Sequence, residues 1–232
     1  MSTSCGERSA HPRSEFKVGF SAGKAFAVTL GLFREAQLIL HDAVLVQIAS
    51  NPKKKRWSYD EYHTLGDNQR YEVIDGELLM LPAPDTQHQA WIRELTLSLG
   101  SHIKARSLGQ LFPSPIDIVL DSENIVQPDL TFIGRSALGT IGKKSIVGVP
   151  SLVIEIVSLA TIGVDRYKKR RLYSRFGISE FWVVDPGNAA VEVLVLNGQD
   201  YDLISVAARQ GALRSTVLEG FEVDVAELIP HL

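Results

Sequence analysis

Two carboxylates and a lysine, spread over residues 125–186, have the types and the order that metal-assisted hydrolysis requires. Asp129 follows a proline in the segment IVQPDLTFIG, and Glu155 is the one charged residue in LVIEIV. Lys169 lies in the basic segment DRYKKRRLY that comes next. Carboxylate oxygens are preferred ligands of Mg²⁺, and a bound divalent ion activates water and stabilises charge on a phosphate. These three residues are therefore our first candidates for a catalytic site.

Glu155 is expected in a buried strand. Every residue of 152–157 except Glu155 is apolar, and β-branched residues are the majority. Such a run is typical of a strand that is covered on both faces. A carboxylate buried there, on the face of Val153 and Val157, costs free energy unless it is paired, protonated or bound to a metal.

Asp129 is expected in a second strand, over residues 125–133. Because side chains alternate along a strand, Asp129 would share one face with Gln127 and Thr131. Pro128 cannot donate to a sheet ladder, which favours a strand edge or a bulge at this point. The opposite face would carry Val126, Leu130 and Phe132.

The segment that contains Lys169 is predicted to form a helix. At about 100° per residue, Lys169 lies on the side of Leu172, Tyr173 and Phe176. A lysine that faces inward needs a partner, and the two carboxylates would supply one. Gly177 is well placed to end the helix. The other basic side chains of the segment point elsewhere and would form a solvated patch: Lys168, Arg170, Arg171 and Arg175.

An ordinary structural role explains the same three residues. Asp129 and Glu155 would then be strand-end residues, and Lys169 would bury its aliphatic stem while its amine reaches water. The pattern of residues alone leaves both interpretations open.

Longer similarities favour the catalytic interpretation. Pro-Asp, then a glutamate in an apolar strand, then a lysine resembles the PD-(D/E)XK nuclease superfamily, with the lysine moved from the position of Val157 to the next helix. From about Arg56 to the C-terminus the chain also resembles the Uma-two family of restriction endonucleases. The blocks that carry this resemblance are RYEVIDGELLMLPAP (70–84), His88, PSPIDIVL (113–120), VQPDL (126–130), LVIEIVS (152–158), DRYKKRRLY (165–173), GISEFWVVDP (177–186) and VLEGFEVDVAELI (217–229).

The resemblance implies a fold, an activity and a set of roles. The fold would be α+β and restriction-endonuclease-like, with a mixed β-sheet flanked by helices. The activity would be hydrolysis of DNA phosphodiester bonds with Mg²⁺ or Mn²⁺. Asp129, Glu155 and a main-chain carbonyl near Ile156 would hold the metal, and Lys169 would orient water or a phosphate oxygen. Glu77 would be an additional metal or water ligand, although a solvent-facing position beside a turn explains it equally well.

Two further features leave alternatives open. His88 lies in the first turn of a predicted helix, where it is either a structural residue or part of the active site. The family has a Ser-Pro pair after the glutamate strand, whereas this chain has Ser158-Leu159-Ala160-Thr161. That difference leaves the metal candidates in place and the geometry of the following loop undecided.

Composition limits the cell compartment and the partners. The formal net charge of −3 is unlike the basic excess of most nucleic-acid-binding proteins, so DNA contact would depend on a local basic patch. The one cysteine, Cys5, excludes a disulfide framework and a cysteine-rich zinc site, and suits a reducing, cytoplasmic environment. The longest apolar stretch, 36–49, is too short for a membrane helix and contains His41 and Asp42.

The chain is expected to have two parts. Residues 1–55 would be an N-terminal extension, partly disordered or helical, and the run Asn51–Arg56 would join it to the next part. This run is predicted to be a solvated linker, with a nucleic-acid or targeting patch as the alternative. Residues 56–232 would form the nuclease domain.

The elements of that domain can be placed from caps, turns and periodicity. Ser58 and Glu61 have capping-box spacing, and Asp75-Gly76 is a hairpin turn signal within 70–81. A helix capped at Asp85 or Thr86 would run to about Ser107 and bury Trp91, Leu95, Leu99 and Ile103. Further strands are expected over 111–120, with Asp117 as a reserve metal ligand, and over 180–184, 191–196, 201–206 and 213–217.

Three functions remain compatible with the sequence. The first is a metal-dependent DNA endonuclease, and the second is a nuclease-fold binding or assembly protein that cuts little or nothing. The third is a hydrolase of another phosphoester. A homodimer is a further expectation, because the apolar meander over 191–217 offers strand edges for pairing.

Overall fold

The structure of the chain is a computed structural model. It describes residues 55–66, 69–158 and 163–231. Apart from Lys55, the predicted N-terminal extension lies outside these residues. No helix in these three ranges is long and apolar enough to cross a membrane.

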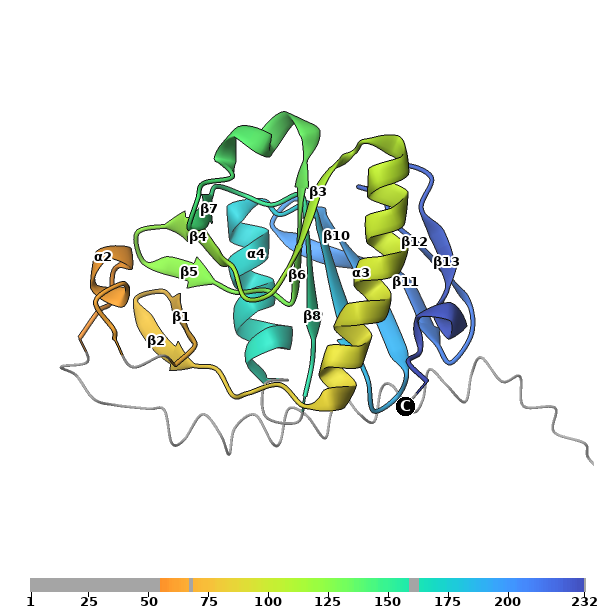
Figure 1. Ribbon diagram of the computed structural model, residues 1–232, viewed down its shortest axis with the longest axis horizontal. Helices are drawn as coiled ribbons and strands as arrows, with labels where there is room; N and C mark the ends of the chain where they lie inside the picture. The colour runs from red at the N-terminus through yellow and green to blue at the C-terminus, as the bar shows by residue number, and fades with distance from the viewer. Residues whose placement is uncertain (1–54, 67–68, 159–162, 232) are drawn as a thin grey trace, which may run out of the picture. The chain divides into compact units, whose positions relative to one another are not determined.

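A mixed six-stranded sheet is the centre of the domain (Figure 1). Its order is β11-β10-β9-β8-β6-β3, and only β8 and β9 run parallel to each other. The strands are β3 (Gly109–Pro113), β6 (Leu130–Gly134), β8 (Leu152–Ile156), β9 (Glu180–Asp185), β10 (Ala190–Asn197) and β11 (Asp200–Ala208). All five residues of β8 are buried, as the apolar run over 152–157 predicts.

A second mixed sheet has five strands in the order β2-β1-β5-β4-β7. The strands are β1 (Tyr71–Ile74), β2 (Glu77–Met80), β4 (Asp117–Asp121), β5 (Asn124–Val126) and β7 (Ser145–Val147). Its β1–β2 hairpin is confirmed at the predicted turn, where Asp75 and Gly76 have φ angles of 51° and 75°. Two consecutive residues with positive φ are the requirement of a type I′ turn.

Different elements cover the two faces of the central sheet (Figure 1). The long helix α3 (Thr86–Arg106) packs on one face together with the C-terminal elements β12 (Ala212–Arg214), β13 (Glu222–Asp224) and η3 (Val225–Leu228). The short helix α4 (Arg170–Phe176) and the second sheet pack on the other face. These layers of mixed sheets and few helices confirm the α+β class.

Local signals set the ends of the helices. Asp85 caps α3 by accepting a hydrogen bond from the main chain of His88, and the left-handed Ser107 ends the helix. The predicted apolar stripe of α3 is buried. Ser58 and Glu61 form the predicted capping box of α2 (Tyr59–Tyr62). Gly177, with a φ of 78°, ends α4.

Two predicted strands are each divided between the two sheets. The predicted strand over 125–133 becomes β5 and β6, joined by Gln127, Pro128 and Asp129. The prediction that Val126 faces the same way as Leu130 was therefore wrong, because the two residues belong to different core clusters. The predicted strand over 111–120 likewise becomes β3 and β4. Both breaks contain a proline, which cannot continue a ladder as a donor.

The segments around the lysine helix are less regular than predicted. The connection over 134–150 contains η1 (Arg135–Thr140), near the expected helical turn, and also the unpredicted strand β7. The lysine helix begins with a π-helical turn, η2 (Val164–Lys169), before α4 continues in α geometry. π-helical turns are rare in proteins, and those that occur are often found at functional sites.

Candidate active site

Glu155 lies in the middle layer of the molecule, on the face of β8 that α4 covers. Val153 and Val157, two positions away, belong to the core cluster that contains Leu172 and Tyr173 of α4. The side chain of Glu155 is buried, and its Oε1 accepts hydrogen bonds from Lys169 Nζ at 3.0 Å and from Tyr173 Oη at 2.5 Å. The helix thus presents two donors, one turn apart, to one carboxylate oxygen.

Asp129 lies directly beside this position. Leu130 of β6 pairs with Ile154 of β8, so the residue before β6 falls opposite Glu155 in the antiparallel register. Asp129 Oδ2 accepts a hydrogen bond from the main-chain N–H of Ile156 at 2.8 Å. The two predicted metal-binding carboxylates therefore lie opposite each other, one in β8 and one directly before β6. Ile156, whose carbonyl is the third predicted metal ligand, is next to both.

His88 contacts the other oxygen of Asp129. Its Nε2 lies 2.9 Å from Asp129 Oδ1, and the side chain retains about a fifth of its exposure, at 18%. The first turn of α3 brings the imidazole to the site, because the cap at Asp85 fixes where the helix begins. The sequence left open a structural role or a place in the active site, and the structure brings His88 into contact with the candidate metal ligand Asp129.

Lys169 joins two buried carboxylates. Its Nζ lies 3.0 Å from Glu155 Oε1 and 2.9 Å from Glu72 Oε1, and all three residues are at most 3% exposed. A buried lysine is stable only with such partners. The predicted inward orientation of Lys169 is what the structure shows.

Glu72 is a site residue that the sequence interpretation missed. It lies on β1, on the same face as Ile74, and is 0% exposed. Oε1 contacts Lys169 and accepts the main-chain N–H of Gln127 at 2.7 Å, whereas the buried Oε2 accepts no hydrogen bond. The signal was a charged residue two positions before Ile74 in the predicted strand YEVI, and therefore on its inward face.

A polar network holds the segment between β5 and β6 that carries Asp129. The side chain of Gln127 accepts from Arg70 Nε at 3.0 Å and donates to Asp117 Oδ1 at 2.8 Å. Tyr62 Oη also donates to Asp117, at 3.0 Å, and burial together with that carboxylate raises the pKa of Tyr62, which keeps the phenol protonated. Asp117, the reserve metal ligand, thus contacts this network and not the pair of Asp129 and Glu155.

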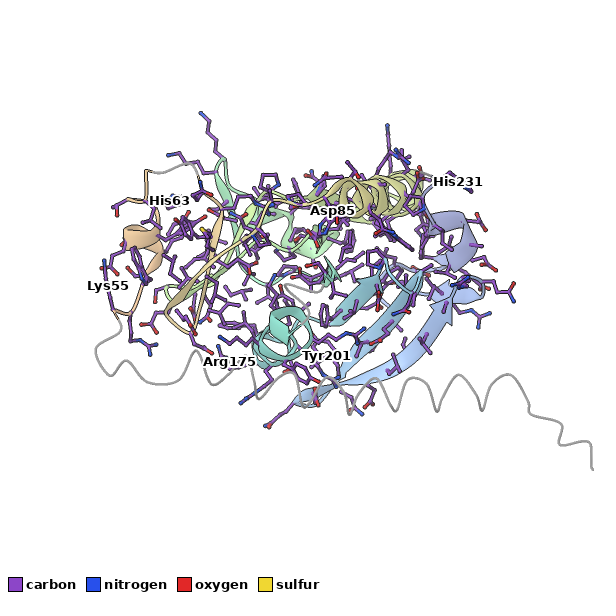
Figure 2. The ribbon with its side chains drawn as sticks, turned by 90° about the horizontal axis from the view of Figure 1, so that it is seen from below. Lys55, His63, Asp85, Arg175, Tyr201 and His231 are labelled. Atoms are coloured by element: carbon purple, nitrogen blue, oxygen red, sulfur yellow. The ribbon has the colours of Figure 1, made fainter. Side chains whose placement is uncertain are left out.

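Ion pairs hold the lysine helix on both sides. On the hairpin side, Lys168 contacts Glu77 at 3.1 Å and Arg175 contacts Asp75 at 2.6 Å. On the side of β10 and β11, Arg166 contacts Glu192 and Arg170 contacts Asp200 and the carbonyl of Tyr201. Figure 2 looks along α4, with Arg175 and Tyr201 labelled on either side of it.

These pairs change the interpretation of two predicted features. Arg171 and Arg175 are exposed as expected, but Lys168, Arg170 and Arg175 each contact a carboxylate, which reduces the positive charge of the expected patch. Glu77 faces the helix and contacts Lys168 at 3.1 Å. Its predicted role as a metal ligand stays a prediction.

The donors around Asp129 and Glu155 fit a hard divalent cation in charge and in chemistry. Asp129, Glu155 and Glu72 are buried carboxylates, and Lys169 is the one amine in contact with them in the described part of the chain. A buried excess of negative charge favours the uptake of a cation. Within the described ranges no three His, Cys, Asp or Glu side chains converge on one metal position. Water and main-chain carbonyls would therefore complete the coordination, as is usual for Mg²⁺.

Comparison with known proteins identifies similar sequences and folds. The profile of the Uma2 family, described as "Putative restriction endonuclease", matches residues 59–226. A search of curated proteins finds no match. Among solved structures, a "putative nuclease belonging to DUF820" from Anabaena variabilis superposes with a TM-score of 0.61 and 17% identity. The match covers 74% of this chain and 97% of that one, and at this identity it shows a shared fold.

Proposed function

Because the chain belongs to the Uma2 family of restriction-endonuclease-like proteins, we propose that it is a metal-dependent endonuclease that hydrolyses DNA phosphodiester bonds. The observation that carries the proposal is the buried set of Asp129, Glu155, Glu72 and Lys169, in which carboxylates outnumber amines. A purely structural ion pair needs one carboxylate for each lysine, and further buried carboxylates are costly without another cation.

Asp129 and Glu155 are the proposed ligands of Mg²⁺ or Mn²⁺, together with the carbonyl of Ile156. A bound divalent ion would supply an activated water and would stabilise charge on the phosphate. The N–H of Ile156 and the imidazole of His88 fix the carboxylate of Asp129. Tyr173 and Lys169 fix one oxygen of Glu155.

Lys169 is the proposed group that orients the reacting oxygen. Its ammonium is held between Glu72 and Glu155, beside the strand end that carries Asp129. A compact cation with three donors is suited to orient a water or a phosphate oxygen. Glu72 acts through Lys169 and is a positioning residue in this scheme.

The test is cleavage of supercoiled plasmid with Mg²⁺ or Mn²⁺ by wild type, Asp129→Ala, Glu155→Ala and Lys169→Ala. We expect each variant to lose at least about 100-fold in rate, since each removes a charge from the reacting centre. Asp202→Ala, which removes an exposed carboxylate on β11, is the matched control and should cut as wild type does. Equal residual nicking by wild type and Glu155→Ala would refute the assignment.

A binding or assembly protein on the same fold is the second candidate. It is favoured by the net charge of −3 and by the carboxylate partners of Lys168, Arg170 and Arg175. Calorimetry separates the two functions. Titration with Mn²⁺ that gives no heat, in wild type and in Asp129→Ala alike, would support the binding protein.

A homodimer is the assembly that we propose. β11 is an edge strand, and its residues Leu203, Ile204 and Val206 are 48%, 47% and 40% exposed. Antiparallel pairing of two copies of β11 would extend the sheet from one copy into the other. Light scattering should give twice the chain mass for wild type and the chain mass for Ile204→Lys, and a wild-type monomer at every concentration would exclude this assembly.

A further inference from the structure

The two buried glutamates that flank Lys169 form a cation position that the lysine itself fills. Nζ lies 2.9 Å from Glu72 Oε1 and 3.0 Å from Glu155 Oε1, so the amine is located between them. Glu72 is 0% exposed, and its Oε2 is buried and accepts no hydrogen bond. A carboxylate oxygen left unpaired in the interior is unfavourable, and it marks a place where a second cation would be bound if one could enter.

The charges decide how many cations the wild-type chain can take. Asp129, Glu155 and Glu72 carry three negative charges when ionised, and Lys169 carries one positive charge. One divalent cation beside Asp129 would make the buried set neutral. A second one would leave two uncompensated positive charges in the interior, which is strongly unfavourable in a medium of low dielectric constant.

We infer that Lys169 occupies the place of a second metal ion, so that the wild-type chain binds one divalent cation, on the Asp129 side, and removal of the amine opens a second position between Glu72 and Glu155. This inference rests on the proposed function, because it assumes that the first metal binds. It assigns to Glu72 a role that becomes visible only when Lys169 is absent.

The neighbouring lysine provides a matched control. Lys168 belongs to the same π-helical turn, but it contacts Glu77, and its side chain is 30% exposed. Removal of its charge should leave the cations at Glu72 and Glu155 unchanged. If the Lys168 and Lys169 variants bind different numbers of cations, the cause is therefore the position of the removed amine and not the net charge of the helix.

The experiment counts Mn²⁺ ions on the full-length protein by isothermal calorimetry, with electron paramagnetic resonance of free Mn²⁺ as the second readout. We expect one ion for wild type and for Lys168→Met, two for Lys169→Met, and one again for Lys169→Met combined with Glu72→Gln. Methionine has nearly the length of lysine without its charge, so the packing around position 169 is retained.

Each result either supports or overturns the inference. Two ions on wild type, or one ion on folded Lys169→Met, would overturn it while leaving the proposed nuclease intact. No ion on wild type would overturn the proposed function together with the inference. If Lys169→Met does not fold, Lys169→Gln, which also removes the charge, takes its place in the count: two ions support the inference, and one ion overturns it.

Discussion

At the scale of single residues, Tyr173 controls the geometry of Glu155. Its hydroxyl donates to Glu155 Oε1 at 2.5 Å, and its ring packs edge-on against Phe181. A residue that hydrogen-bonds a metal ligand fixes the orientation of that ligand, and its loss typically costs about 10- to 100-fold in metal affinity or activity. We therefore expect Tyr173→Phe to weaken Mn²⁺ binding and plasmid cleavage by about tenfold.

Tyr201→Phe is the matched control for this prediction. Tyr201 is also buried, and its hydroxyl donates to the carbonyl of Ile178 at 2.7 Å. Both variants remove one buried hydrogen bond and should lose a similar free energy of unfolding, about 1 kcal/mol. Only Tyr173→Phe should change Mn²⁺ affinity, measured by calorimetry. Equal Mn²⁺ affinities in the two variants would show that Tyr173 has a purely structural role.

Some residues of the candidate site could be predicted from the sequence, and others could not. The contact between Glu155 and Lys169 could be predicted because Glu155 is the one charge in an apolar strand and Lys169 shares a helix face with Leu172, Tyr173 and Phe176, which indicates buried partners. Glu72 was missed because its strand has only four residues, so that Ile74, two positions later, is the one apolar residue that marks the face of Glu72 as inward. Glu77 was chosen as a metal ligand because of the family resemblance. Its position beside a turn predicts a solvent-facing residue equally well.

At the scale of elements, the pair of Glu77 and Lys168 holds the lysine helix against the β1–β2 hairpin. Lys168 Nζ now lies 3.1 Å from Glu77 Oε2, so reversing the charge of either residue brings two like charges together and they repel each other. We expect Glu77→Lys and Lys168→Glu each to lower the cleavage rate several-fold, through displacement of Lys169. The double variant should recover most of the rate, because the reversed pair can form again.

This double-mutant cycle also distinguishes the two roles of Glu77. A metal ligand cannot be replaced by a lysine, so the double variant would remain inactive if Glu77 bound the metal. The reversal of Arg214 and Glu222, a pair on β12 and β13 far along the chain, provides the control and should leave the rate unchanged. Recovery in the cycle of Glu77 and Lys168, with no change in the control cycle, would assign Glu77 to positioning.

Strand boundaries show why element prediction failed in particular places. The patterns of 111–120 and 125–133 are compatible with single strands, yet each is divided between two sheets at a proline. Alternation of side chains describes the faces of one sheet, but it contains no information about a change of sheet. The change of sheet between β5 and β6 places Asp129 directly before β6, opposite Glu155.

At the scale of the whole molecule, ion pairs reduce the number of basic side chains that the lysine helix can offer to DNA phosphates. The net charge is −3, and three of the basic residues on the lysine helix contact carboxylates. Each phosphate neutralised by a lysine or arginine contributes a slope of about −0.9 to the logarithm of the association constant against the logarithm of salt concentration. In the proposed nuclease, much of the attraction for DNA would therefore come from the bound divalent cation.

We therefore expect weak dependence of DNA binding on monovalent salt and strong dependence on the divalent ion. Fluorescence anisotropy with a labelled duplex, Ca²⁺ in place of Mg²⁺, and KCl varied at constant Ca²⁺ should give a slope no steeper than about −3. Removal of Ca²⁺ with a chelator, or the Asp129→Ala change, should reduce affinity at least about tenfold. Arg214→Ala, which removes a basic residue paired with Glu222, is the control and should leave the slope unchanged. A slope near about −6 that persists without the divalent ion would mean that a basic surface, and not the metal site, is the main contact with DNA.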